Sequence, residues 1–257
     1  DFGVHRLSWL QKRGFFPNGI PVHDTIARVI AHLNPKKLQQ CFADWMRDVT
    51  KRTEGELIAI DGKTLRGSWQ PGDRGSAIHM VSAFACHSAL VLGQVKTDDK
   101  SNEISAIPEL LAMLELKGCL VSIDAMGCQK DIAEQIVAQG SDYLLAVKGN
   151  QRKLHHALEQ SFQEFDSLSK EEVTSQKSRV EYRSYQVLNA AVLPESIRND
   201  WPTIKTIAMS DSYRMTKGKK SALERRYFIS SGELDVDRFA QACRGHWSIE
   251  NKLHWVL

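Results

Sequence analysis

The spacing of apolar and polar positions is typical of helices in some parts of the chain and of strands in others. The first 50 residues have the helical spacing. Apolar residues recur at spacings of three and four from Ile26 to Leu33, which is typical of an amphipathic helix. Asn34 and Pro35 follow, and an N-cap residue before a proline is a common helix start. We therefore predict a small helical module over residues 1–50.

From residue 57 the pattern changes to short apolar runs of strand length, separated by amphipathic helical segments. The predicted order is three strands, a helix, a strand, a helix, a strand and a helix. The second and third strands form a hairpin around His87 and Ser88. The segments are, in order, "LIAID", "AIHMVSAFAC", "ALVLGQVKTD", "NEISAIPELLAMLELKG", "CLVSID", "CQKDIAEQIVAQG", "DYLLAVKG" and "NQRKLHHALEQSFQEF".

Residues 171–231 depart from this order. They contain the strand-like pieces "SRVEYRSYQVL", "TIKTIAMS" and "RRYFISSG", separated by polar loops. We predict an all-β insertion over about residues 171–231, before a last helix that begins near Asp235 and continues to the end. The predicted fold class is therefore α/β, with a mixed sheet flanked by helices over residues 51–257.

Composition narrows the class of protein only slightly. The chain has 257 residues and a formal net charge of +3, which permits a polyanionic partner without indicating one. Its five cysteines are scattered and never spaced as CxxC, which argues against a disulfide framework and a zinc ribbon. No segment has the ~18 apolar residues that a membrane helix needs. We expect a soluble cytoplasmic protein without a membrane partner.

Two of the predicted strands end in an aspartate, Asp61 in "ELIAIDGKTLRGS" and Asp124 in "CLVSIDAMGCQ". In open α/β sheets, functional residues gather at the carboxyl ends of strands, and right-handed crossovers allow these two strands to lie side by side. Paired carboxylates without a nearby His or Cys suit a hard ion such as Mg²⁺ or Mn²⁺. The alternative is that each aspartate only caps a turn.

A third acid comes from the end of the chain. On a continuous helix His246, Glu250 and His254 share one face, while Ile249 and Leu253 belong to an apolar stripe on another. Glu250 can then face the two aspartates while the stripe packs on the sheet. One alternative is a solvated glutamate beside two surface histidines. Another is a zinc site from the two histidines, although a third ligand at familiar spacing is missing.

Five sequence blocks, taken together and in order, resemble the DDE transposases of bacterial insertion sequences, in the group that includes the H-repeat-associated proteins. The blocks are "IAIDGKTLRGS", "VSIDAMGCQ", "YLLAVKGNQ", "RYFISS" and "HWSIENKLHWVL". The segment "GIPVHDTIARVIAHLNP" resembles the N-terminal associated domain of that group. The resemblance covers nearly the whole chain.

The resemblance implies an RNase H-like fold with an insertion before the last helix. It also implies that Asp61, Asp124 and Glu250 are the catalytic acids and hold Mg²⁺ or Mn²⁺, as two ions. Related insertion-sequence families have a Tyr and an Arg upstream of this glutamate, where this chain has Cys243 and His246. The implied function is cleavage and transfer of DNA strands at the ends of an insertion sequence.

The implied partners are the terminal inverted repeats and the target DNA in a bacterial cytoplasm, with a homodimer or larger assembly on DNA. Basic residues near the strand ends and in the insertion are candidates for phosphate contacts, which give affinity more than sequence choice. These candidates are Lys63, Arg66, Lys148, Arg152, Lys217, Lys219 and Lys220. The alternative for each basic run is a solvated loop.

Two other functions remain open at this point. The first is a folded DNA-binding remnant of a transposase that cannot cut. The second is a metal-dependent nuclease without strand transfer. Retention of all three acids favours the transposase.

Overall fold

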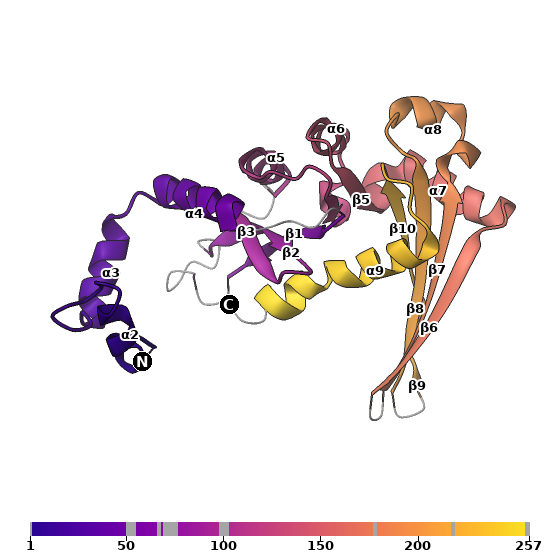
Figure 1. Cartoon of the computed structure of the whole chain (residues 1–257). Coiled ribbons are helices and arrows are strands. Elements are labelled where there is room, and N and C mark those ends of the chain that lie inside the picture. Colours follow the sequence, from indigo (N-terminus) through magenta and orange to yellow (C-terminus); the bar gives the residue numbers. More distant parts are fainter. Residues whose placement is uncertain are drawn as a thin grey trace. The chain divides into compact units, whose positions relative to one another are not determined.

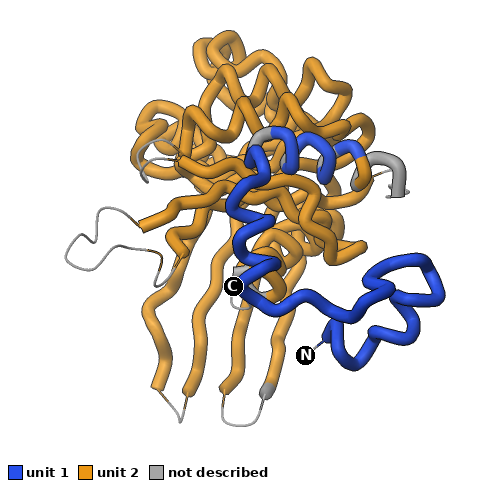
Figure 2. Tube along the Cα trace, turned by 90° about the vertical axis from the view of Figure 1, so that its left-hand side faces the viewer, with its two compact units in different colours: residues 1–44 blue, residues 45–257 orange. Residues whose placement is uncertain are grey.

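The computed structural model describes residues 2–49, 55–65, 68, 77–97, 103–176, 179–216 and 219–254. It divides into two compact units, residues 1–44 and residues 45–257 (Figure 2). None of the described helices is both long and apolar enough to cross a membrane.

The first unit is helical, as predicted. It contains α1 (Phe2–His5), α2 (Leu7–Gln11) and α3 (His23–His32), and α4 (Pro35–Val49) begins in it. The expected N-cap of α4 is confirmed, because the Lys37 amide donates to Asn34 Oδ1 at 3.1 Å. The division into units falls inside α4, before the predicted boundary at residue 50.

The second unit is built on one mixed sheet. In the described residues this sheet has ten strands, and β9 pairs with β8 beside the main path β3-β2-β1-β4-β5-β10-β8-β7-β6 (Figure 1). The strands are β1 (Leu57–Thr64), β2 (His79–Ala85), β3 (Leu90–Thr97), β4 (Leu120–Ile123), β5 (Asp142–Val147), β6 (Leu168–Gln176), β7 (Arg179–Asn189), β8 (Thr206–Thr216), β9 (Lys219–Lys220) and β10 (Glu224–Ser230).

Helices cover both faces of this sheet. On one side lie α5 (Glu103–Met113), α6 (Lys130–Ala138) and α7 (Arg152–Glu164), and on the other lies α9 (Val236–His246) (Figure 1). Successive strand residues point to opposite faces, so each strand feeds two cores. Ile58 and Ile60 of β1 pack with α5 and α6, whereas Leu57 packs on the α9 side. The predicted mixed sheet flanked by helices is confirmed.

The predicted order of elements from β1 to α7 is also confirmed. The β2–β3 hairpin is antiparallel, and β4 lies parallel to β1, as the crossover rule allowed. The next strand, β5, is parallel to β4. This arrangement brings the carboxyl ends of β1, β4 and β5 to one edge of the sheet.

The segment 171–231 differs from the predicted all-β insertion in two ways. It includes a short helix, α8 (Glu195–Asp200), so it is β-rich but not all-β. Its strands continue the main sheet, since β10 pairs with β5. The sequence also missed most of β6, "LSKEEVTSQ", because a strand with so few apolar residues has no period-two hydrophobic signal.

The last helix is not continuous. The helix begins next to Asp235, as predicted, and this residue is its N-cap, accepting from the Arg238 amide at 2.7 Å. After α9 ends at His246 there is a turn at Trp247, residues 248–249 are α-helical again, and Glu250–His254 form a π-helical segment. The expected 3.6-residue period therefore stops before Glu250, although Ile249 is fully buried.

Phe239 is the central contact between α9 and the sheet, and we expect its loss to be costly. It is fully buried and lies edge-on to Tyr185 and Phe228, with ring centroids at 5.8 and 5.3 Å. Phe239→Ala should lower the free energy of unfolding by about 3–5 kcal/mol because it leaves a cavity. Urea unfolding measures the change. The control Phe165→Ala, at a residue 44% exposed, should cost less than about 1 kcal/mol.

Candidate active site

Asp61 and Asp124 occupy matching positions on neighbouring parallel strands. The last paired residues of β1 and β4 are Ile60 and Ile123, and each aspartate is the next residue in its strand direction. Neighbouring strands are about 4.8 Å apart, so the two backbones carry these side chains next to each other. The sequence prediction that the two strands lie side by side is confirmed.

Both aspartates belong to the face of the sheet that α9 covers. Two residues before Asp61, Ala59 packs with Ile249. Two residues before Asp124, Ser122 bonds to His246 at 2.9 Å. Residues two apart in a strand share a face, and the backbone at Asp124 is still extended. The carboxylates therefore lie at the carboxyl ends of the strands, on the α9 side.

Each carboxylate also has a local backbone bond. Asp124 is the N-cap of the short 3₁₀-helix Ala125–Gly127 and accepts from the Met126 amide at 3.0 Å. Asp61 accepts from the Gly62 amide at 2.9 Å. Turn capping, the alternative weighed for Asp124, is thus real. It fixes one carboxylate oxygen and is compatible with a ligand on the other.

The loop after β5 holds the loop that follows Asp124. Asn150 donates to the Ala125 carbonyl at 2.7 Å, and Gln151 donates to the Cys128 carbonyl at 2.9 Å. The sequence singled out the neighbouring lysine and arginine but not these two amides. The signal was available in "GNQ", because amide side chains at a strand end can bond to an adjacent loop.

Glu250 lies at the start of the π-helical segment, directly after the buried Ile249. Ile249 packs on Ala59 of β1, which places this part of the chain over the strand that carries Asp61. The three acids do not form a closed group, however. Within the described ranges, no three His, Cys, Asp or Glu side chains are grouped so that they could hold a metal ion.

His246 is engaged with the sheet. Its Nδ1 lies 2.9 Å from Ser122 Oγ, and burial lowers its pKa, with the charges of Asp61 and Asp124 acting in the opposite direction. The predicted zinc alternative also needs His254, whose side chain lies outside the described residues.

A buried histidine–glutamate contact lies behind the end of the strand that carries Asp61 and was not predicted. His79 of β2 pairs with Glu103 at the start of α5, and both are buried. Thr64 Oγ1 bonds to His79 Nδ1 at 2.8 Å. Burial raises the pKa of Glu103, the contact with His79 lowers it, and the charges of Asp124 and Asp61 raise it further. This contact was not predictable from the sequence, because a glutamate in the first turn of a helix is usually solvated.

The candidate DNA contacts fall in three places. Lys63 follows Asp61 by two residues in β1, so it shares the face of that aspartate. Lys148 and Arg152 are exposed beside the loop after β5. Lys219 and Lys220 form β9 at the far end of β8, away from the aspartates along the sheet (Figure 1). Arg66 and Lys217 lie outside the described residues.

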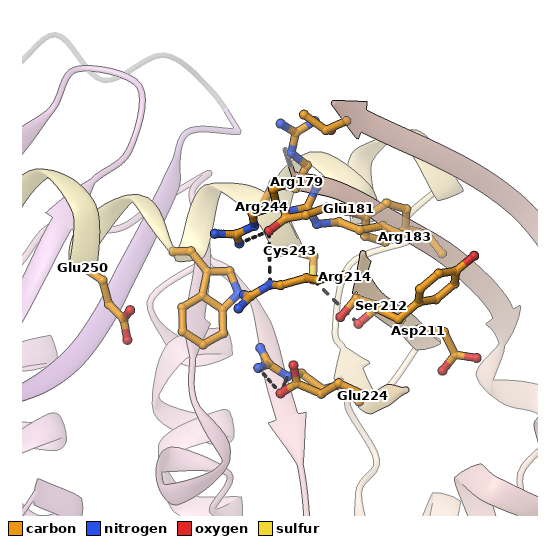
Figure 3. Close-up of a pocket in the computed structure, with 16 residues that line it drawn as sticks. Arg179, Glu181, Arg183, Asp211, Ser212, Arg214, Glu224, Cys243, Arg244 and Glu250 are labelled. Atoms are coloured by element: carbon orange, nitrogen blue, oxygen red, sulfur yellow. Dashed lines mark hydrogen bonds and ion pairs between the residues drawn. The ribbon is translucent and has the colours of Figure 1, made fainter. Parts of the chain in front are cut away.

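A cavity of about 680 Å³ lies between β7, β8, β10 and the end of α9, and Glu250 is one of its lining residues (Figure 3). Five arginines line it as well: Arg179, Arg183, Arg214, Arg226 and Arg244. The sequence predicted basic residues in this segment but not that strands and helix would gather them beside Glu250.

The arginines of this cavity are held by acids. Glu181 contacts Arg179 and Arg183 and lies 3.1 Å from Arg214 Nε. One carboxylate thus faces three guanidinium groups. Glu181 cannot pair with all of their N–H donors or neutralise all of their positive charge. Arg226 lies over the Trp247 ring, 4.6 Å from its centroid. Glu224 contacts Arg226, and Glu172 lies 3.0 Å from Arg244 Nη1. Because Asp211, Glu224 and Glu250 also line the cavity, carboxylates offset much of its positive charge.

Comparison with known proteins gives the family. Residues 52–257 match the family described as "Transposase DDE domain", and residues 1–46 match "DDE_Tnp_1-associated". This chain belongs to the DDE transposase family. The predicted resemblance is confirmed.

Relatives of this transposase-family chain occur in Escherichia coli. It is 51% identical to "Putative transposase YncI" of Escherichia coli O157:H7, over 100% of this chain and 68% of the relative. It is 47% identical to "H repeat-associated putative transposase YhhI" of Escherichia coli (strain K12), over 100% of this chain and 70% of the relative.

One solved structure has a weak likeness to this chain. It is described as "Cryo-EM structure of piggyBac transposase synaptic complex with hairpin DNA (SNHP)", with a TM-score of 0.43 and 11% identity, covering 77% of this chain and 40% of that one. A likeness at this level assigns no fold.

Residue 62 has no room for a side chain, and we expect the added methyl group in Gly62→Ala to clash with Glu103. A Cβ at residue 62 would lie 2.3 Å from Glu103 Oε1, so the buried carboxylate must move. The substitution should lower the free energy of unfolding by about 1–3 kcal/mol, as overpacking does. Chemical denaturation measures this loss.

A double-mutant cycle tests the cause. In the Gly62→Ala/Glu103→Ala variant, the two losses should be less than additive by about 0.5–3 kcal/mol. Gly149→Ala is the matched control, because nothing lies within 4 Å of a Cβ there. Strict additivity in the cycle would contradict the proposed clash.

Proposed function

We propose that this protein is an active transposase that cleaves DNA at the ends of an insertion sequence and transfers the freed strand. The observation that carries the proposal is that Asp61 and Asp124 each directly follow the last paired residues, Ile60 and Ile123, of neighbouring parallel strands. Family membership supplies the class of reaction. An RNase H-like core is part of the proposal, supported by the order β3-β2-β1-β4-β5 with β4 and β5 parallel to β1.

The donor set fits a hard divalent cation in chemical type. Asp61 and Asp124 offer carboxylate oxygens on one face of the sheet, and Mg²⁺ and Mn²⁺ prefer such ligands. Both aspartates are held by a backbone amide, so their orientation is restricted before any ligand arrives. We propose that these two residues and Glu250 hold one or two such ions. When bound, the ions would activate the attacking hydroxyl and offset charge on the phosphoryl group.

The other residues of the site would hold the DNA. Lys63 shares the face of Asp61, and Lys148 and Arg152 lie beside the loop that is bonded to the Asp124 loop. Their charges would contact phosphates on either side of the bond to be cut. Arg66 and Lys217 are proposed for the same role from sequence alone. The DNA ends, the target DNA and a homodimer or larger assembly are the proposed partners, in the bacterial cytoplasm.

A second candidate function is a folded DNA-binding protein that does not cut. The observation that favours it is that Glu250 is not grouped with Asp61 and Asp124 in the described residues. A protein that binds DNA through Lys148 and Arg152 would need no such group. A metal-dependent nuclease without strand transfer is separated from a transposase only by the joining reaction.

Glu250→Gln and Asp61→Asn test the chemistry. Each keeps the side-chain shape and removes the charge, so each should reduce cleavage and strand joining by at least about 1,000-fold, or about 4 kcal/mol of barrier. DNA affinity and the thermal midpoint without metal should stay near wild type. Gel assays with DNA carrying the element's ends, in Mg²⁺ and in EDTA, measure both reactions.

Controls separate the rival functions. Glu109→Gln, on the opposite face in α5, should leave both reactions unchanged. Wild-type protein that binds DNA but never cuts would support the DNA-binding remnant, and cutting without joining would support the nuclease. Equal activity of Glu250→Gln and wild type would exclude Glu250 from the site.

The β8–β9 end should contribute affinity only. Lys219 and Lys220 are exposed, so Lys219→Gln/Lys220→Gln should weaken binding to unrelated DNA sequences equally. The slope of log affinity against log salt should fall by about 0.9 for each lost phosphate contact. Lys96→Gln/Lys117→Gln makes the same change in net charge elsewhere and should leave the slope unchanged. An unaltered slope in the first variant would mean that these lysines are only solvated.

A further inference from the structure

The end of α9 and the turn after it contact the strands of the two aspartates at three residues, Gly245, His246 and Ile249. At Gly245 the helix approaches β1 so closely that a Cβ would lie 2.5 Å from Leu57 Cδ2. The next residue, His246, is 2.9 Å from Ser122 Oγ of β4. Ile249 is fully buried against Ala59. Glu250 is the residue that follows.

Of these contacts, the bond between Ser122 and His246 is the polar one. Ser122 is 2% exposed and lies two residues before Asp124 on the same face, so this hydroxyl moves with that strand. A buried polar pair is costly to break, because each partner is left without a hydrogen bond away from water. Apolar packing at Gly245 and Ile249 tolerates small shifts, whereas a hydrogen bond fixes distance and direction.

A contact with another strand holds the same turn. Arg226 of β10 lies over the Trp247 ring. His246 is therefore held by β4, and the next residue, Trp247, is held by β10. Beyond this turn the backbone becomes π-helical from Glu250. Helical spacing from α9 therefore does not fix the direction of Glu250, and the anchors at residues 245–249 must do so.

We propose that His246 is a positioning residue, whose bond to Ser122 fixes the end of α9 on β4 and thereby sets where Glu250 stands relative to Asp61 and Asp124. This inference rests on the proposed function, because it takes Glu250 as the third acid. The imidazole acts through Ser122 and touches neither metal nor DNA. The change from α-helix to π-helix leaves the direction of Glu250 undetermined. The bond between His246 and Ser122 would fix that direction.

Three substitutions separate this role from others. Ser122→Ala removes the bond from the sheet side, and His246→Gln removes the polar atom at the position of Nδ1. His246→Asn keeps a polar atom where Nδ1 was, so it should preserve the bond. Ser161→Ala, a buried serine of α7, is the matched control for loss of a buried hydroxyl.

Two measurements report on the bond. Amide hydrogen exchange over residues 246–254 should be at least about tenfold faster in Ser122→Ala and His246→Gln, because local opening becomes easier. The Mn²⁺ concentration for half-maximal cleavage should rise by about 10- to 100-fold, as for outer-shell partners of metal ligands. His246→Asn and Ser161→Ala should stay near wild type, and DNA affinity should not change in any variant.

Other outcomes overturn the proposal. If Ser122→Ala matches wild type in both measurements, the bond positions nothing. If both His246 variants lose DNA affinity or bound Zn²⁺ while Ser122→Ala does not, the imidazole acts directly on a ligand. Should wild-type protein neither bind Mn²⁺ nor cut DNA, the proposed function fails, and unchanged exchange at residues 246–254 in Ser122→Ala would separately reject the positioning role.

Discussion

The parallel pairing of β1 with β4 is the constraint on which the rest of the site depends. These strands are separated by a hairpin and a helix in the chain, yet their register ends with Ile60 opposite Ile123. A shift of one residue would turn one aspartate to the other face of the sheet. The register is itself fixed by burial, because Ile58 and Val121 must point to the α5 and α6 side. Core packing on one face thus determines the position of charges on the other.

The two faces of the sheet near Asp61 carry different side chains. On the α9 side, the chain places carboxylates, His246 and the residues that lead to Glu250. On the other side, Glu103 occupies the space that a side chain at residue 62 would fill, and it is paired with His79. A buried contact of this kind is weak evidence for stability, since desolvation of a charged group offsets the attraction. Here Glu103 lies against Gly62 at the end of the strand, and His79 contacts both Glu103 and Thr64.

The β-rich half extends the same sheet and gathers arginines toward the end of α9. Glu181 with three arginine partners, and Arg226 with Trp247, keep these cations oriented without a ligand. Preorganised donors lose less freedom on binding than flexible ones.

The sequence by itself determined the order of elements from β1 to α7, the strand-end aspartates and the family, because hydrophobic period and short motifs are properties of neighbouring residues. It could not predict β6, whose residues lack that period. It also could not predict the turn at Trp247 and the π-helical segment after it, because the apolar positions Ile249 and Leu253 keep helical spacing in the sequence. The contacts Ser122–His246 and His79–Glu103 join residues 124 and 24 positions apart. Only the tertiary structure decided them, because such contacts exist only once strand register and helix packing bring distant side chains together.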